Sequence, residues 1–191
     1  LDLYEIPYTF SDPLVMSLCL HKGMTKQIIR DAGLATADFT VARSVADIKV
    51  LPFAPPFFAK PVAEGTGMGI TANSVIHSIT ELETVCQGLL EQFKQPVLIE
   101  QFLPGREFTV GLTGTGNDAR VLGTMEILLS DNAEQQVYSL ENKEGWEGRV
   151  EYRPVSPEQD GLIQEVETLA LKSWNILGCR DGGRVDIRCD H

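Results

Sequence analysis

FFAKPVAEGTGMGI, residues 57–70, is an apolar run that leads through a lysine into a glycine-rich segment. Prolines bound the run, which favours a strand over a helix. Glycines let backbone N–H groups approach an anion closely, and Lys60 can balance phosphate charge. The spacing is neither a P-loop, which ends in Gly-Lys-Ser/Thr, nor a dinucleotide fingerprint, which leads from a strand into a helix. A glycine hairpin with a solvated lysine is the alternative.

A second segment, VLIEQFLPGREFTVG at residues 97–111, places two acids around a turn. Glu100 ends a strand-like apolar run, and Glu107 follows the Pro104–Gly105 turn. A carboxylate at the end of a buried strand can accept hydrogen bonds from an amine or a ribose hydroxyl. A surface hairpin with solvated ends explains the same pattern.

A third segment, LGCRDGGRVDIRCD at residues 177–190, ends in a strand-like pattern. Arg184 and Asp186 are two residues apart, so in a strand they point to the same face. An arginine and an aspartate facing one site could stabilise an oxyanion and bind a hard metal ion. An exposed ion pair worth ~0–1 kcal/mol is the alternative.

Working outward from these segments, the chain alternates between helical and strand-like stretches. Helices are expected at residues 13–31, 46–50, 78–93 and 156–177, and strands at 39–43, 57–62, 97–102, 107–113, 120–129 and 183–189. Ser78 with Glu81 forms a capping box, and Gly33 and Gly178 suit helix ends. The polar residues 141–148 predict a mobile loop. This mixture predicts an α+β fold with a lobe boundary near Glu100.

Composition limits the function. The 191 residues carry a formal net charge of −11, and the pI is about 4.7, which argues against nucleic acid and anionic membranes as partners. No secretion signal or membrane span is apparent. The four cysteines lack metal-ligand spacing, so we expect them to be reduced and mostly buried, in the cytoplasm. Both ends fall within a pattern, and we expect them to be cuts.

Together these segments, with EIPYTFSDPLVMSLCLHKGMTKQIIRDAGL at residues 5–34, resemble the D-alanine–D-alanine ligase family of ATP-grasp enzymes. The resemblance covers nearly the whole chain. It implies two α+β lobes that clasp a nucleotide, with the N-terminal substrate lobe largely missing and the C-terminal lobe truncated. The corresponding division is a remnant of the N-terminal lobe at residues 1–18, a central lobe at 19–99 and an incomplete C-terminal lobe at 100–191.

The resemblance also assigns nucleotide contacts to individual residues. Lys22 and Lys60 would face the ATP phosphates, and Glu107 would hold the ribose. Glu100 would accept from the adenine amino group. The phosphate-covering loop would comprise Glu64, Gly65, Thr66, Gly67 and Gly69. The adenine hinge would comprise Glu100, Gln101 and Leu103.

The implied reaction is ATP-dependent ligation of a carboxylate to an amine through an acylphosphate. Lys143 would reach the γ-phosphate, Arg184 would contact the acyl intermediate, and Asp186 would bind Mg²⁺, with Mn²⁺ as a substitute. The implied partners are ATP, small amino acids and a second copy in a homodimer. The isolated chain is expected to be inactive, since the family's Glu-x-Asn metal motif is absent.

The sequence departs from the family pattern at several positions. His21 stands where an aspartate is usual, Gln101 replaces a lysine beside the hinge, and EGTGMGI replaces the frequent EGSSVGI. These differences leave two alternatives open. One is an ATP-grasp ligase for other amino or hydroxy acids, and the other is a non-catalytic nucleotide-binding module.

Overall fold

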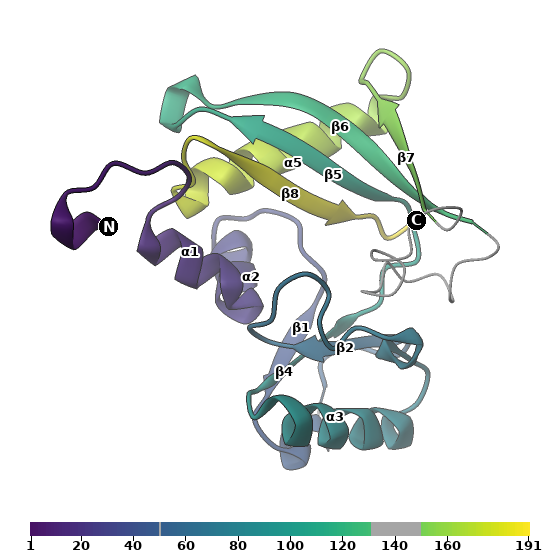
Figure 1. Ribbon diagram of the computed structural model, residues 1–191. Coiled ribbons are helices and arrows are strands. Elements are labelled where there is room, and N and C mark those ends of the chain that lie inside the picture. Colours follow the sequence, from purple (N-terminus) through teal and green to yellow (C-terminus); the bar gives the residue numbers. More distant parts are fainter. Residues whose placement is uncertain (50, 131–149) are drawn as a thin grey trace.

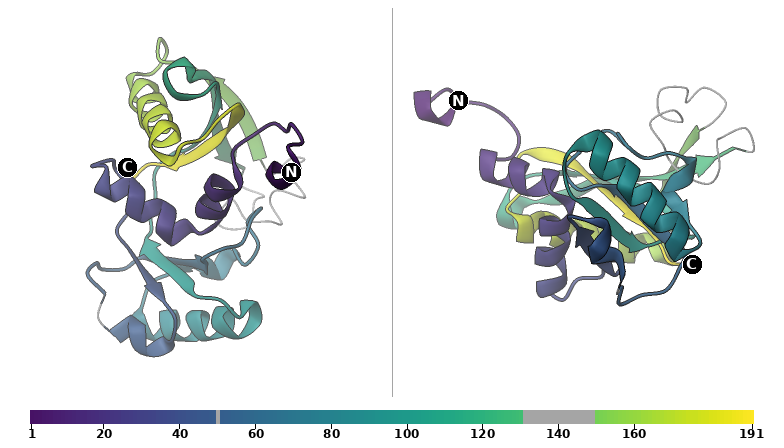
Figure 2. Two further views of the ribbon diagram at one scale, coloured as in Figure 1. Left: turned by 90° about the vertical axis from the view of Figure 1, so that its left-hand side faces the viewer. Right: turned by 90° about the horizontal axis from the view of Figure 1, so that it is seen from below.

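The computed structural model describes residues 1–49, 51–130 and 150–191. Figure 1 shows two separate sheets, one above the other, each covered by its own helix, and Figure 2 gives two further views. The elements in chain order are η1 (Asp2–Tyr4), α1 (Pro13–Leu20), α2 (Lys22–Asp31), β1 (Phe39–Ala42), η2 (Val45–Lys49), β2 (Phe57–Pro61), η3 (Ala72–Ser74), β3 (Val75–Ile76), α3 (Ile79–Phe93), β4 (Val97–Gln101), β5 (Glu107–Thr113), η4 (Gly116–Asp118), β6 (Arg120–Leu129), β7 (Val150–Val155), α5 (Gly161–Leu177) and β8 (Gly182–Arg188).

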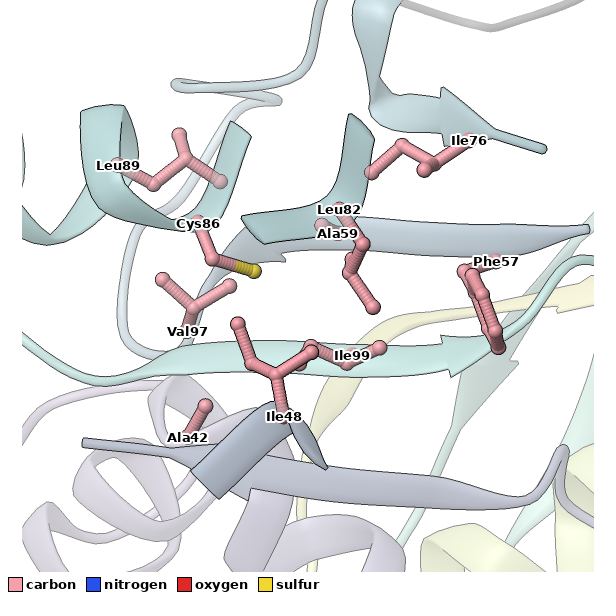
Figure 3. Packing of buried hydrophobic residues seen from close by; sticks show 10 residues of the cluster. All are labelled: Ala42, Ile48, Phe57, Ala59, Ile76, Leu82, Cys86, Leu89, Val97 and Ile99. Carbon is pink, nitrogen blue, oxygen red and sulfur yellow. The ribbon is translucent and has the colours of Figure 1, made fainter. Parts of the chain in front are cut away.

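The first sheet, called sheet A, has the strand order β1-β4-β2-β3, and all its pairings are antiparallel. One face packs against α3 (Figure 3), whose Leu82 and Cys86 point toward Val97 and Ile99 of β4. Phe57 on β2 belongs to the same core and is fully buried. Each such large apolar side chain contributes ~1.5–3 kcal/mol when it is removed from water. Because successive side chains of a strand point to opposite faces, the residues that alternate with these core residues lie on the face of sheet A away from α3.

The second sheet, called sheet B, has the order β7-β6-β5-β8 and is also antiparallel. Helix α5 covers one face, where Phe108, Val110 and Leu112 of β5 pack against Ile163 and other residues of the helix. Trp174 of α5 lies in this core as well, and its indole Nε1 donates to the Gly114 carbonyl at 3.1 Å. The face of sheet B that points away from α5 carries the alternate residues.

The single helix expected at residues 13–31 is in fact two helices. The chain turns at His21, which has φ −84° and ψ 87° and joins α1 to α2. The His21 imidazole Nδ1 accepts from the backbone N–H of Met24 at 3.1 Å, so it caps the second helix. A residue that caps a following helix has non-helical backbone angles, which explains the break.

Other expectations need smaller changes. The last helix starts at Gly161 with Asp160 as its N-cap, not at residue 156, because the Asp160 carboxylate accepts from the Leu162 N–H at 3.0 Å. The short segment after β1 is a 3-10 helix, and β3 and β7 were not predicted. The capping box at Ser78 is present in part. The Ser78 hydroxyl accepts from the Glu81 backbone N–H, but the Glu81 carboxylate accepts from the backbone N–H of His77 and not from that of Ser78. The strands at 39–43, 57–62, 97–102, 107–113, 120–129 and 183–189 are confirmed to within one or two residues.

The expectation that the cysteines are mostly buried is wrong. All four are free thiols, but Cys86 alone is buried, while Cys19 is exposed and the others are partly exposed. Cys19 and Cys179 form a thiol pair between α1 and the end of α5, and a hydrogen bond from Cys19 lowers the pKa of Cys179 to about 7. In the described part of the chain, the helices are all too short or too polar to cross a membrane.

Candidate functional site

A buried ion pair lies on the face of sheet A opposite α3. Lys60 of β2 and Glu100 of β4 share this face, because Glu100 pairs in register with Phe58, two residues before Lys60. The Lys60 Nζ donates to Glu100 Oε1 at 2.5 Å, and only 19% of the lysine side chain and 13% of the glutamate side chain are exposed. The alternative of a solvated lysine is therefore wrong.

Helix α2 brings a second lysine to the same carboxylate. The Lys26 Nζ lies 3.0 Å from Glu100 Oε2 and donates to Thr36 Oγ1 at 2.7 Å. The helix lies close to the sheet because of Gly23, where an added Cβ would stand 2.6 Å from the Val41 side chain. Sequence reasoning missed Lys26, although it lies one helical turn from Lys22 and therefore on the same face.

The pKa shifts in this cluster reflect burial and competing charges. Burial favours the neutral form of Glu100, but Lys60 and Lys26 act more strongly together, and the net result is a lowered pKa. Burial lowers the pKa of Lys26, and Glu100 only partly offsets this. The pKa of Lys22 is lowered by burial and then by repulsion from Lys60. Three ammonium groups thus face Glu100 and Glu64, which leaves an excess of positive charge.

The glycine-rich loop after β2 is tied to this cluster. The Lys22 ammonium donates to the Glu64 carbonyl, and its backbone N–H donates to Val62 at 2.9 Å. Gln95 Nε2 donates to the Glu64 carboxylate at 2.6 Å, and its Oε1 accepts from Ala63 at 2.7 Å. The base of the loop is therefore fixed from both sides by residues that are distant in sequence.

The tip of the loop adopts left-handed backbone angles. Thr66, Gly67 and Gly69 have φ of 54°, 86° and 77°. An added Cβ at Gly69 would lie 2.5 Å from the Pro61 ring, so the residue is required both by conformation and by packing. An added Cβ at Gly65 would meet nothing within 4 Å, so space is open beside this backbone. The loop therefore combines a fixed base with an accessible glycine backbone.

Two phenylalanines and an arginine connect the sheets at the segment between β4 and β5. Phe58 of sheet A stacks on Phe102 with ring centroids 6.2 Å apart, and the Arg188 guanidinium lies 5.1 Å from the Phe102 centroid. Arg188 also donates to the Leu103 carbonyl at 2.5 Å and to the Glu107 carboxylate at 3.0 Å. Glu100 and Glu107 thus belong to different sheets, and the hairpin alternative is wrong. Gln101, at the end of β4, is exposed.

The remaining candidates lie along β8. Arg184 and Asp186 pair in register with Gly111 and Thr109 of β5, so they share the face of sheet B away from α5, as expected. Both are exposed, and no ion pair links either of them to another described residue. The Thr109 hydroxyl on this face is buried, and the structure gives it no hydrogen-bond partner in the described ranges. This buried hydroxyl is therefore unsatisfied among the described residues.

The residues fit a magnesium ion in part. Asp186 offers a hard carboxylate oxygen, but residues 1–49, 51–130 and 150–191 contain no group of three His, Cys, Asp or Glu side chains able to hold a metal. Mg²⁺ is commonly held by one or two carboxylates together with substrate phosphates. Asp186 would thus be one anchor, with phosphate oxygens supplying others. Lys143 and the predicted loop at 141–148 lie outside the described residues.

Two cavities are lined by residues other than those of this cluster. One of about 310 Å³ lies under the N-terminal segment, beside Tyr8 and Arg180. Another of about 390 Å³ is lined by residues of both α2 and β1, with His21 and Phe39 among them. Neither is lined by Lys60 or Glu100, so neither contains the charge cluster.

Comparison with solved structures identifies the two helix-backed antiparallel sheets as an ATP-grasp fold. Among solved structures, D-alanine–D-alanine ligase from Bacillus anthracis complexed with ATP aligns with a TM-score of 0.70 at 18% identity, covering 98% of this chain and 56% of that one. VanG D-Ala:D-Ser ligase from Enterococcus faecalis aligns with a TM-score of 0.74 at 23% identity, covering 98% and 53%. These similarities establish the fold.

The family follows from the sequence. Residues 28–191 match the family model described as D-ala D-ala ligase C-terminus. A D-alanine–D-alanine ligase from Bordetella petrii is 33% identical over 194 residues, which cover 100% of this chain and 56% of the relative. The chain belongs to the D-alanine–D-alanine ligase family, and the resemblance drawn from its motifs is confirmed. It spans just over half the length of this relative.

Proposed function

We propose that this chain supplies the ATP-binding part of an ATP-dependent carboxylate–amine ligase of the D-alanine–D-alanine ligase type. The observation that carries the proposal is the cluster of Lys22, Lys26 and Lys60 around Glu100, beside the glycine-rich loop. We assign residues 1–18 to a remnant of an N-terminal lobe, 19–99 to the central lobe and 100–191 to the C-terminal lobe.

The cluster has the chemistry that a triphosphate requires. Buried lysines with lowered pKa lose solvation on folding, and an anionic ligand restores the missing counter-charge. Lys22 and Lys60 approach from a helix and a strand, and the loop from Glu64 to Gly69 offers backbone N–H groups between them. The adenine would lie beside Glu100, Gln101 and Leu103, and the ribose beside Glu107.

The proposed reaction has two steps. A substrate carboxylate oxygen attacks the γ-phosphorus of ATP, the bond to ADP breaks, and an acylphosphate forms. An amine then attacks the acyl carbon, loses a proton, and inorganic phosphate leaves. Arg184 would stabilise the oxyanion on the acyl carbon, and Lys143 the transferred phosphate. Mg²⁺ at Asp186, or Mn²⁺ in its place, would supply charge neutralisation to the phosphates.

The exposed arginine and aspartate on β8 support this assignment. Neither has an ion-pair partner within the described ranges, so both are available to a ligand on the same face of sheet B. Spacing of ~3.3 Å per residue along a strand separates Asp186 from Arg184 by roughly 7 Å. That separation suits one group at the phosphates and another at the acyl carbon.

Substrate identity and assembly form the finer part of the proposal. We expect D-alanine as both amino acids, a homodimer, and a cytoplasmic enzyme. Ligation of other amino or hydroxy acids is the second candidate, because a solved protein of the same fold is named a D-Ala:D-Ser ligase. A nucleotide-binding module without turnover is the third.

The test uses the full-length protein that contains this chain. Phosphate release is measured with ATP and Mg²⁺ in the presence of D-alanine, D-serine, D-lactate or L-alanine, and products are identified by mass spectrometry. The proposal expects release that depends on D-alanine and yields the dipeptide. A different preferred acid would support the second candidate, and ATP binding without release for any acid would overturn the ligase assignment. The isolated 191-residue chain is expected to show no D-alanine-dependent release.

A further inference from the structure

Lys26 has more contacts than Lys60, which meets only Glu100 and, at 5.3 Å, the Phe58 ring among the described residues. The Lys26 ammonium contacts the Glu100 carboxylate at 3.0 Å and the Thr36 hydroxyl at 2.7 Å, and it lies 5.4 Å from the centroid of the Phe39 ring. The contacts of this helical lysine thus come from two strands, β4 and β1, and from the loop that precedes β1. Lys60 contacts the other oxygen of the same carboxylate.

We propose that Lys26 is a positioning residue that keeps Glu100 ionised and in place while Lys60 exchanges Glu100 for a nucleotide phosphate. This inference rests on the proposed ATP site. It assigns the two lysines different tasks, although both contact one carboxylate. Lys60 is the exchangeable partner, and Lys26 is the permanent one.

The burial of Glu100 makes a permanent partner necessary. Its side chain is 13% exposed, and a buried carboxylate that loses its only cation becomes an uncompensated buried charge, which is costly. If Lys60 turned to a phosphate without Lys26, ATP binding would include that cost. With Lys26 at 3.0 Å, the carboxylate keeps one charged hydrogen-bond donor throughout the exchange.

The surroundings of Glu100 explain the expected proton balance. The charged groups facing it are Lys22 and Lys26 from α2 and Lys60 from β2, and Arg30 acts on Lys26 from the next helical turn. Burial raises the pKa of Glu100, whereas the lysines lower it. Removing Lys26 and withdrawing Lys60 leaves burial dominant, so the carboxylate would take up a proton when ATP binds.

The experiment is isothermal titration of the chain with ATP and Mg²⁺ in two buffers of different ionisation enthalpy. The variants are Lys26→Met, Lys26→Gln and Lys26→Arg, with Lys172→Met as the matched control, because Lys172 is an exposed lysine within α5. We expect the Met and Gln variants to bind ATP at least tenfold more weakly. Compared with the unaltered chain, these variants should take up as much as one additional proton for each ATP bound. Their affinity for ATP should therefore fall as pH rises from 6 to 8. Lys26→Arg should restore both affinity and proton balance.

A double-mutant cycle with Glu100→Gln separates this role from simple structural support. A glutamine carries no charge to hold, so Lys26→Met in that background should change ATP affinity by less than twofold. Circular dichroism checks that each variant folds, and Lys26→Gln replaces Lys26→Met if the latter does not. If the folded Met or Gln variant keeps the ATP affinity and the proton balance of the unaltered chain, the proposed role of Lys26 is overturned, but the proposed ATP site is not. Absence of ATP binding by the unaltered chain would overturn the proposed function as well.

Discussion

Glu100→Gln should destabilise the chain without changing its fold. The substitution keeps the size of the side chain but removes the negative charge that two lysines share at 2.5 and 3.0 Å. All three side chains are less than 20% exposed, so solvent screens these interactions weakly. Removing one partner from such a group costs about 3–5 kcal/mol. The glutamine oxygen still accepts one hydrogen bond, which places our expectation at the lower limit, about 3 kcal/mol.

Urea denaturation at pH 7 followed by circular dichroism measures this change, with Glu165→Gln as an exposed control on α5. The pKa of Glu100 is lowered in the folded state, because the attraction of Lys60 and Lys26 exceeds the effect of burial. The stabilisation that ionised Glu100 gives to the folded state is therefore present above the ordinary pKa of a glutamate. It is lost as pH falls through the lowered pKa of Glu100 in the folded state. The difference in free energy of unfolding between the wild type and Glu100→Gln should therefore become smaller at acid pH. A loss under 1 kcal/mol at pH 7, or one independent of pH, would refute the reasoning.

Three further outcomes follow from other parts of the structure. Gly69→Ala should lower stability by ~1–3 kcal/mol, because φ is 77° and the new methyl would meet the Pro61 ring, whereas Gly65→Ala should change it little; urea denaturation compares the two. Thr109→Val should raise stability by ~1 kcal/mol in the same assay, because it removes a buried hydroxyl that has no hydrogen-bond partner in the described structure. Cys179 should react with iodoacetamide with a midpoint near pH 7, because its pKa is lowered to about 7. Reaction of Cys179 only above pH 9, read by mass spectrometry, would contradict this assignment.

The sequence predicts the elements whose cause is local. Alternation of apolar and polar residues identifies β5 and β6, and period-two spacing places Arg184 and Asp186 on one face. Ser78 marks the start of α3, because its hydroxyl binds a backbone N–H three residues away. These signals act over a few residues, so they survive without knowledge of the tertiary structure.

Features that depend on distant contacts could not be predicted in the same way. In the sequence, Lys26 is indistinguishable from an ordinary surface lysine. Its partner Glu100 lies 74 residues later, on β4, and only the fold places the two side chains in contact. Arg188 lies on the same face as Asp186, but its role appears only where β8 meets Leu103 and Glu107. The break at His21 depends on a cap competing with helix continuation, which a periodic pattern does not resolve.

The central claim is that Lys22 and Lys60, beside Glu100, bind the phosphates of ATP. Its most direct test is calorimetric titration with ATP and Mg²⁺ of the unaltered chain, of Lys60→Ala and of Lys94→Ala. Lys94 is exposed at the end of α3 and serves as the control. Loss of a charged phosphate contact should cost ~1.5–3 kcal/mol, so Lys60→Ala should bind roughly 10- to 150-fold more weakly while Lys94→Ala retains wild-type affinity. Equal affinities of the two variants for ATP would contradict the assignment.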